Sequence, residues 1–419
     1  MRIDIERDRL VETMEDQAEI GAIDGGGLDR LTLTDADREV REWFRDRMEA
    51  VGLDVRVDEM GNMFGRRPGT EPDAGTVLLG SHLDSQPHGG IYDGPLGVIG
   101  ALEFVRTLED EDIQTVHPVE IVNWTNEEGS RFQPAMMSSG VWAGEIPREE
   151  AYRAADDEGK QFVDELERIG YRGDVPAEPQ YEYDSYLELH IEQGPSLDEK
   201  DRDVGIVTGI VGLRWGEVTF RGQANHSGTT PMHHRSDALV AASDVITQVR
   251  RIPGTLGERT AATTGVVDVA PASINIVPAE VRFTVDLRDP DDDVADEAVE
   301  RVKDEVRAAA AREGVEWEYE TRMEAKSVAF ADRCVDAVRS AVTTLGYDGT
   351  ELVSGAGHDA TYAANVCDTG MVFAVSEAGK SHTPEEYTSW DDCYKAANTL
   401  ANAALDLAGV ADAGAKRTG

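Results

Sequence analysis

Side chains that could bind a metal ion follow one short apolar run near the N-terminal end of the chain. Residues 77–79 are Val-Leu-Leu, and they are followed by His82 and Asp84 and then by Asp93 in a glycine-rich loop. A short, fully apolar run is typical of a buried parallel strand, and open α/β sheets place their chemistry where such strands end. We therefore expect His82 and Asp93 to bind metal and Asp84 to orient His82.

Other apolar runs also end in residues that are common metal ligands. One run precedes Glu127 and Glu128, a second contains His190 near its end, and a third lies a few residues before His382. If these runs are strands of one sheet, their ends meet at one edge and bring the side chains together. A set of histidines and carboxylates at a sheet edge favours a metal site.

The two adjacent glutamates suggest hydrolytic chemistry. Neighbouring side chains in a loop point in different directions, so one can bind a metal while the other reaches a metal-bound water. A two-metal hydrolase needs a bridging carboxylate and a general base beside that water. Asp93 suits the bridge, Glu127 the base and Glu128 a ligand. The alternative is that both glutamates are merely solvated in so acidic a chain.

The expected helices and strands that position these residues indicate an α/β protein of two domains. A chain of 419 residues is too long for one core. We predict a discontinuous domain at 1–210 and 327–419, with a mixed, mostly parallel sheet between helices, and an inserted α+β domain at 211–326. Helices are expected at 3–20, 35–50, 96–108, 235–251, 292–313, 331–345 and 391–407, with a further helical region at 147–175, and the main strands of the first domain at 77–79, 119–124, 186–191 and 371–375.

Composition limits the partners and the location of the protein. The 40 basic and 83 acidic residues give a net charge of −43, which would repel nucleic acid. Because the excess acid is spread along the chain, we interpret it as adaptation to a salty cytoplasm. Three cysteines without a C-x-x-C pattern predict a reducing compartment. The N-terminus lacks signal-peptide features and no run reaches the ~18 apolar residues of a membrane helix, so we expect a soluble, cytoplasmic protein.

Nine motifs stand in an order that resembles one enzyme family. The chain resembles the M20-type metal-dependent amidohydrolases of the amidase, hydantoinase and carbamoylase branch, which cleave N-carbamoyl amino acids, ureidopropionate and allantoate. The resemblance runs from about residue 20 to 405. The motifs are GSHLDSQP at 80–87, GGIYDG at 89–94, NEEGSRF at 126–132, LELHIEQGP at 187–195, HSGTTPM at 226–232, NIVP at 275–278, DLR at 286–288, SGAGHDA at 354–360 and SHTP at 381–384.

The resemblance implies two divalent metal ions per subunit in the discontinuous catalytic domain. One ion would be held by His82, Asp93 and His190, and the other by Asp93, Glu128 and His382. Zinc is the leading candidate, and manganese, cobalt and nickel also suit such ligands. By the same resemblance, Glu127 would deprotonate a bridging water and later protonate the leaving nitrogen. A histidine at position 190 favours the amidase branch, because related dipeptidases usually carry an acidic residue there.

The resemblance also implies that the inserted domain is a lid through which the protein forms a homodimer. Arg288 would pair with the substrate carboxylate, and Asn275 and Gln193 would add hydrogen bonds. His226 would stabilise the oxyanion from across the dimer. The alternatives are a surface turn for His226 and a sheet-edge salt bridge for Arg288. His358 is expected either to line the substrate pocket or to serve in packing.

The expected function is hydrolysis of the linear ureido C–N bond of an N-carbamoyl-L-amino acid. Allantoate and β-ureidopropionate are alternative substrates, because all three present a carboxylate and a ureido group. An M20-type dipeptidase is more remote. So is a nucleotide binder: residues 374–381 match the P-loop pattern except that Ala374 replaces the first glycine, but Pro384 would fall in the first turn of the required helix. A non-catalytic metal-binding protein would be favoured only if Glu127 were absent.

Overall fold

The computed structural model describes residues 1–257 and 259–411, and the chain divides into two units. Unit 1 comprises Met1–Thr208 and Phe330–Gly419, and unit 2 comprises Gly209–Ala329. The junctions predicted from the sequence, at 210/211 and 326/327, lie two and three residues from those between the units. Unit 2 is thus an insertion in the chain of unit 1.

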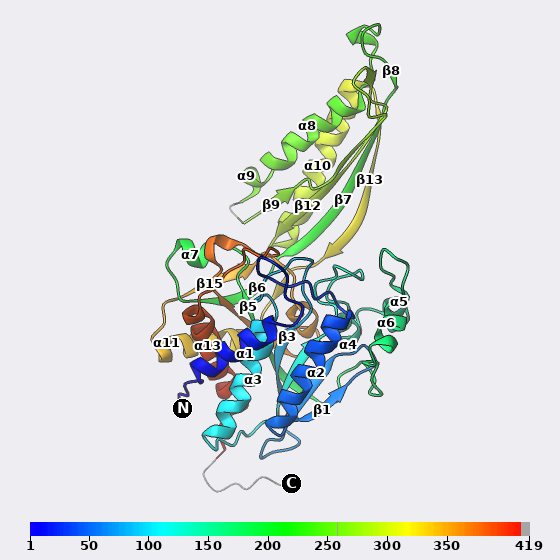
Figure 1. The fold of residues 1–419 in the computed structure, drawn as a ribbon. Helices are drawn as coiled ribbons and strands as arrows, with labels where there is room; N and C mark the ends of the chain where they lie inside the picture. Colours follow the sequence, from blue (N-terminus) through cyan, green and yellow to red (C-terminus); the bar gives the residue numbers. More distant parts are fainter. Residues whose placement is uncertain (258, 412–419) are drawn as a thin grey trace. The chain divides into compact units, whose positions relative to one another are not determined.

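A mixed sheet forms the centre of unit 1 (Figure 1). Its four middle strands, in the order β4-β3-β5-β16, are parallel to one another. On one side β2 and β1 follow in antiparallel pairing, and on the other side β6 is antiparallel to β16 and also pairs with β15. The α/β fold class is therefore confirmed, with the parallel part confined to the middle of the sheet. The strands are β1 (Asp54–Val57), β2 (Met63–Arg67), β3 (Thr76–His82), β4 (Val119–Trp124), β5 (Tyr183–Ile191), β6 (Val204–Ile210), β15 (Gly349–Ser354) and β16 (Asp368–Ala374).

Helices shield the parallel strands from water, which explains why those strands are buried along almost their whole length. Helix α3 packs on β3, β4 and β5, and α13 packs beside it on β5 and β16. None of the described helices combines the length and apolar character that crossing a membrane requires. The helices of unit 1 are α1 (Arg7–Ala18), α2 (Asp35–Ala50), α3 (Pro95–Asp110), α4 (Met137–Trp142), α5 (Arg148–Arg153), α6 (Phe162–Arg168), α7 (Ser196–Glu199), α11 (Asp332–Leu345), α12 (Ala360–Ala363) and α13 (Trp390–Ala408), with the 3₁₀ turn η2 (Glu377–Gly379).

Two segments of unit 1 differ from the sequence prediction, and a third bears on an alternative. The first helix begins at Arg7 because the Glu6 side chain caps it, accepting hydrogen bonds from the backbone N–H groups of Asp8 and Arg9. The region 147–175 contains only the short helices α5 and α6. After β16, the described residues 375–389 form a 3₁₀ turn and loops but no α-helix. A P-loop requires a helix at this point, so the nucleotide-binding alternative is excluded.

Unit 2 is an antiparallel sheet with two long helices on one face (Figure 1). Its strands run in the order β10-β12-β7-β13, and β9 also pairs with β12. Alternate residues of β7 and β12 point toward α8 and α10 and form the buried core of the unit. The elements are β7 (Gly212–Arg221), β8 (Asn225–His226), η1 (Met232–His234), α8 (Ala238–Arg251), α9 (Pro253–Leu256), β9 (Ala261–Thr263), β10 (Val267–Ala270), β11 (Ile276–Val277), β12 (Glu280–Asp289), α10 (Asp292–Glu313), β13 (Glu316–Ala325) and β14 (Val328–Ala329).

Candidate metal centre

Two histidines at the ends of neighbouring parallel strands present the same ring nitrogen to one carboxylate. His82 is the last residue of β3, and His190 lies one residue before the end of β5. The Nδ1 of His82 lies 2.9 Å from the carbonyl oxygen of Asp84, and the Nδ1 of His190 lies 3.0 Å from that of Ile191. A carbonyl oxygen only accepts, so in the neutral ring each Nδ1 carries the proton and each Nε2 has a lone pair for a metal.

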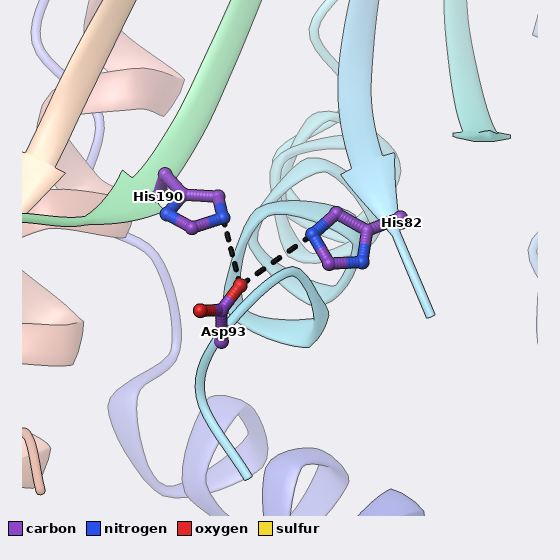
Figure 2. A group of neighbouring side chains, drawn as sticks. All are labelled: His82, Asp93 and His190. Atoms are coloured by element: carbon purple, nitrogen blue, oxygen red, sulfur yellow. Dashed lines mark ion pairs between the residues drawn. The ribbon is translucent and has the colours of Figure 1, made fainter. Parts of the chain in front are cut away.

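Asp93 lies between the two histidines and also faces a second group of side chains. Its Oδ1 atom is 3.0 Å from His190 Nε2 and 3.5 Å from His82 Nε2 (Figure 2). Its Oδ2 atom faces the other way, at 3.5 Å from His382 Nε2. The two oxygens of one buried carboxylate are therefore directed at different partners, which is the arrangement a bridging ligand needs.

Gly94 allows Asp93 to approach His82 this closely. Its φ angle is 82°, in the left-handed region that favours glycine. A Cβ atom at this position would lie 2.4 Å from Cε1 of the His82 ring. The glycine thus allows the backbone that precedes α3 to contact the imidazole ring of His82.

The second group consists of Asp93, Glu128 and His382. His382 Nε2 lies 3.5 Å from Glu128 Oε2. The Glu128 carboxylate also accepts hydrogen bonds from Gln86, through its side-chain amide at 2.8 Å and its backbone N–H at 3.1 Å. The Gln193 amide donates to Asp93 Oδ2 at 2.6 Å and lies 3.2 Å from His382 Nε2. Gln193, predicted to bind substrate, is thus beside this second group.

Glu127 lies beside the first group without belonging to either one. Its Oε2 atom is 3.5 Å from His82 Nε2, and only 7% of the residue is exposed. Its backbone N–H donates to Asp84 Oδ1 at 3.4 Å. Asp84 was predicted to orient His82. Its carbonyl oxygen lies closer to the ring than its carboxylate does, which is 3.8 Å from Nδ1. The carboxylate instead contacts the loop that carries Glu127.

These donors fit two divalent ions. Ligands at about 2.1 Å from one tetrahedral metal lie about 3.4 Å from one another. The His–Asp and His–Glu separations of 3.0–3.5 Å in the two groups have this size. In addition, His82 Nε2 is buried and has no hydrogen-bond partner among the described residues. A buried polar atom of this kind calls for a ligand.

The protein groups alone leave an excess of negative charge at the centre. Burial raises the pKa of Glu127 well above its usual value, and burial together with Asp93 does the same for Glu128. Burial would also raise the pKa of Asp93, but His190 and His82 hold it well below its usual value. Burial is the largest cause of both glutamate shifts, so additional positive charge would be needed to keep these carboxylates ionised. Divalent cations would supply that charge.

His358 lies behind His190 and is almost fully buried. Its ring centroid is 4.4 Å from that of His190, and its Nε2 atom lies 2.9 Å from the Ser354 hydroxyl. Burial and the neighbouring His190 lower the pKa of His358 well below its usual value, which keeps the ring neutral. These contacts favour the packing alternative for this residue over direct contact with substrate.

Three further residues with predicted roles lie in unit 2. His226 is in β8, opposite Ile276 of β11, and Asn275 precedes that residue, so His226 and Asn275 are neighbours. Arg288 is near the end of β12, opposite Leu213, and its guanidinium donates to the Asp286 carboxylate at 3.0–3.3 Å. The Arg288–Asp286 pair is the salt bridge that the sequence suggested as the alternative role of Arg288.

Sequence reasoning did not assign roles to three residues that contact the predicted ligands. Gln86 contacts Glu128, and the Ser381 hydroxyl donates to Asp93 Oδ2 at 3.0 Å. Glu386 accepts hydrogen bonds from the backbone of the loop that carries Asp93. Gln86 lies in the same motif as His82, and Ser381 in the same motif as His382. This proximity in the sequence could have suggested that they contact the ligands. Glu386 carried no such signal beyond its position four residues after His382.

The sequence and the structure are both similar to those of known amidohydrolases. Residues 78–406 match peptidase family M20/M25/M40. The chain is 42% identical to an N-carbamoyl-L-amino-acid amidohydrolase of Rhizobium meliloti, over 97% of this chain and 98% of the relative. It is 32% identical to an allantoate amidohydrolase of Escherichia coli K12, over 96% and 98% of the two chains. A crystal structure of an amidase of the hydantoinase/carbamoylase family from Burkholderia multivorans matches with a TM-score of 0.92 and 45% identity, over 97% and 98% of the chains. The chain therefore belongs to peptidase family M20/M25/M40, a family of metal-dependent hydrolases.

Proposed function

We propose that this protein hydrolyses the linear ureido C–N bond of an N-carbamoyl-L-amino acid with two divalent metal ions. The observation that carries the proposal is the pair of side-chain groups that share Asp93, with Glu127 beside them. The substrate class is suggested by the relative from Rhizobium meliloti, which is named as an N-carbamoyl-L-amino-acid amidohydrolase.

In this proposal each group of side chains holds one ion. His82, Asp93 and His190 hold the first, and Asp93 shares the second with Glu128 and His382. When bound, such ions polarise the substrate carbonyl and make water a nucleophile at neutral pH. Zinc is the first candidate because it prefers His and carboxylate ligands, and manganese, cobalt or nickel could take its place.

Glu127 would serve as the general base and then as the general acid. It takes a proton from the attacking water and delivers it to the leaving nitrogen. Burial raises the pKa of Glu127, and divalent ions beside it would favour the ionised form that the first step needs. The Asp84 carboxylate, which accepts from the Glu127 backbone N–H, would keep this loop in place.

His226 would stabilise the oxyanion as a neutral donor. The backbone N–H of Gly228 donates to His226 Nδ1 at 3.0 Å, so in the neutral ring the proton is on Nε2. The exposed Nε2–H group is then available for a negatively charged oxygen. Asn275, next to His226 on the paired strand, would add a hydrogen bond to the substrate.

Arg288 would bind the substrate carboxylate, because a guanidinium pairs with a carboxylate in bidentate fashion. Its present contact with Asp286, with the two side chains 32% and 30% exposed, is the kind of partly exposed ion pair that a substrate can replace. Gln193 would contribute a hydrogen bond from beside Asp93 and His382.

The active unit would be a homodimer, because Arg288 and His226 of one chain are too far apart for one small substrate. Arg288 pairs with Leu213 near the start of β7, whereas His226 comes after Arg221, which ends that strand. Leu213 and Arg221 are eight residues apart, and at about 3.3 Å per residue this corresponds to about 26 Å. Figure 1 shows β8 beyond the end of β7 within unit 2. His226 would therefore act on the substrate of a partner chain.

The test is a substrate panel with the full chain reconstituted with zinc, manganese, cobalt or nickel and assayed in high salt. The panel contains N-carbamoyl-L-amino acids, allantoate, β-ureidopropionate and dipeptides, and the assay follows amine and ammonia release. Turnover of the carbamoyl amino acids is expected. Turnover of allantoate alone would establish the second candidate, which the Escherichia coli relative favours by its name. Cleavage of dipeptides alone would overturn the proposal.

A pair of adjacent substitutions separates the base from a ligand. Glu127→Gln should keep both metal ions and lower turnover by about 10²–10⁴-fold, the usual contribution of a general base. Glu128→Gln should instead reduce the metal content, because Glu128 contacts His382 within the second group. Metal analysis of both variants provides the readout. If Glu127→Gln kept full turnover, the proposed role of Glu127 would be wrong.

A further inference from the structure

Glu386 is a buried carboxylate that contacts the loop carrying Asp93 and the loop carrying His382. Its Oε1 atom accepts hydrogen bonds from the backbone N–H of Tyr92 at 3.2 Å and of Asp93 at 3.1 Å. Its Oε2 atom accepts from the Ser381 hydroxyl at 3.1 Å. Only 5% of the residue is exposed. Glu386 belongs to neither ligand group, but it binds the backbone of the loop that carries Asp93.

The loop before Asp93 is shaped around this carboxylate. A Cβ atom at Gly90 would lie 2.0 Å from Glu386 Oε1 and 2.1 Å from its carboxyl carbon. No side chain could therefore replace the glycine unless Glu386 moved away. The fit between Gly90 and Glu386 indicates that the carboxylate is part of the loop's structure.

Ser381 extends the connection from Glu386 to the Asp93 carboxylate itself. Its hydroxyl lies 3.0 Å from Asp93 Oδ2 and 3.1 Å from Glu386 Oε2. A hydroxyl has one proton, so it can donate to only one of these acceptors at a time. Ser381 also precedes His382, whose side chain is about half exposed and whose φ angle is 55°. Glu386 and Ser381 therefore join a buried ligand to an exposed one whose backbone is in an uncommon conformation.

We propose that Glu386 is a positioning residue that fastens the Asp93 loop to the His382 loop by hydrogen bonds, so that Asp93 can serve both metal ions. The inference rests on the proposed two-metal function. Partners that orient metal ligands raise the affinity of a site because they reduce the freedom the ligands lose on binding. Glu386 does so through the backbone of one ligand loop and through Ser381 of the other.

Two substitutions distinguish positioning from the effect of charge. Glu386→Gln removes the charge and keeps the reach: its carbonyl oxygen can accept from Tyr92 and Asp93, and its amide can donate to Ser381, whose proton then goes to Asp93. Glu386→Asp keeps the charge but is one methylene shorter, so it cannot reach both loops at once. Positioning predicts that the glutamine variant binds metal well and the aspartate variant poorly.

The measurement is zinc affinity and stoichiometry of the full-length protein, stripped of metal and titrated against a chromogenic chelator. Glu386→Asp and Glu386→Ala are expected to bind zinc about 10–100-fold more weakly than the unsubstituted protein, the usual cost of losing such a partner. Glu386→Gln is expected to stay close to the unsubstituted protein. The matched control is Glu385→Ala, since Glu385 is exposed and pairs with Lys380 at the surface.

Each outcome decides the proposal. Equal losses for the glutamine and alanine variants would assign the effect to charge and overturn it, as would an aspartate variant with full affinity. If the alanine variant does not fold, the comparison of glutamine with aspartate still decides, with thermal unfolding of the metal-free proteins as the check. An unsubstituted protein that binds no zinc, manganese, cobalt or nickel would contradict the proposed function itself.

Discussion

At the scale of single residues, the proton positions of the histidines prepare the centre for cations. His82 and His190 each direct Nδ1–H to a main-chain carbonyl oxygen within two residues along the chain. This local contact fixes the ring and leaves Nε2 directed at Asp93. The His190 ring also packs against the ring of His358, at 4.4 Å between centroids, so its orientation depends on the local backbone and on one distant side chain.

Asp93 is the residue on which both ions should depend. We expect Asp93→Ala to lose both ions, because Oδ1 and Oδ2 face different groups of ligands. His190→Ala should lose mainly one ion, since His190 belongs to the first group alone. Metal content per chain, measured by mass spectrometry after dialysis, gives the comparison. An Asp93→Ala protein that keeps one ion at full occupancy would count against the bridge.

The predicted ligands and two residues beside them, Asp84 and Gln193, could be named from the sequence, but Glu386 could not. His82, Glu128 and His190 each follow or end an apolar run, so strand prediction alone brought them together. The motif resemblance also correctly identified the family. Glu386 lies almost 300 residues from the loop it contacts, and nothing in the local pattern links the two. Such contacts depend on how distant loops meet, which periodicity does not describe.

At the scale of elements, close packing of α3 on the sheet sets the position of the strand ends. A Cβ atom at Gly97 would lie 2.2 Å from the carbonyl oxygen of Leu189 in β5 and 2.7 Å from Ser81 Cβ in β3. Both strands end in predicted ligands, His190 and His82. The helix can lie this close only because Gly97 has no side chain.

Gly97→Ala should therefore destabilise unit 1 by about 1–3 kcal/mol, the usual cost of overpacking a core. A matched control is Gly100→Ala on the same helix, where the added Cβ would meet the end of the Leu189 side chain at 2.9 Å. A flexible side chain can move, whereas a strand backbone cannot do so without shifting its ligands. Denaturant unfolding of both variants gives the comparison, and equal losses would show that the strand contact is unimportant.

The predicted bounds of helices and strands were least accurate where contacts with distant residues outweigh the local helix or strand propensity. Residues 3–6 were expected in the first helix, but the backbone N–H groups of Ile3 and Ile5 donate to the side chains of Asn402 and Asn398 in α13. The two-residue strand β14 is too short to produce a periodic pattern. The long helices α8, α10 and α13 have strong apolar faces and were found close to their predicted ranges.

At the scale of the whole molecule, the net charge of −43 predicts dependence on salt. Repulsion among surface carboxylates opposes folding and weakens as salt shortens the screening length, from about 10 Å at 0.1 M to about 3 Å at 1 M. We expect the midpoint of thermal unfolding to rise between these two concentrations of potassium chloride. Sucrose at matched osmolality is the control. An equal rise in sucrose would attribute the effect to solvent exclusion and not to charge.

The predicted exchange of His226 between chains can be tested by mixing two inactive proteins. His226→Ala should disable the site of the partner chain, and Arg288→Ala should disable the site of its own chain. A mixed dimer would then carry one site with both residues intact and one with neither. Random pairing makes half of the dimers mixed, so activity should return to about a quarter of the unsubstituted level.

This recovery distinguishes the two ways of using His226. If each chain used its own His226, every site in the mixed dimer would keep one defect and the mixture would stay inactive. Each variant taken alone through the same dissociation and reassociation is the control. The expectation of recovery comes from unit 2 itself, because Arg288 lies near one end of the β7–β12 pair and His226 follows the other end. The β-sheet holds these two residues apart, so we expect a second chain to supply one of them.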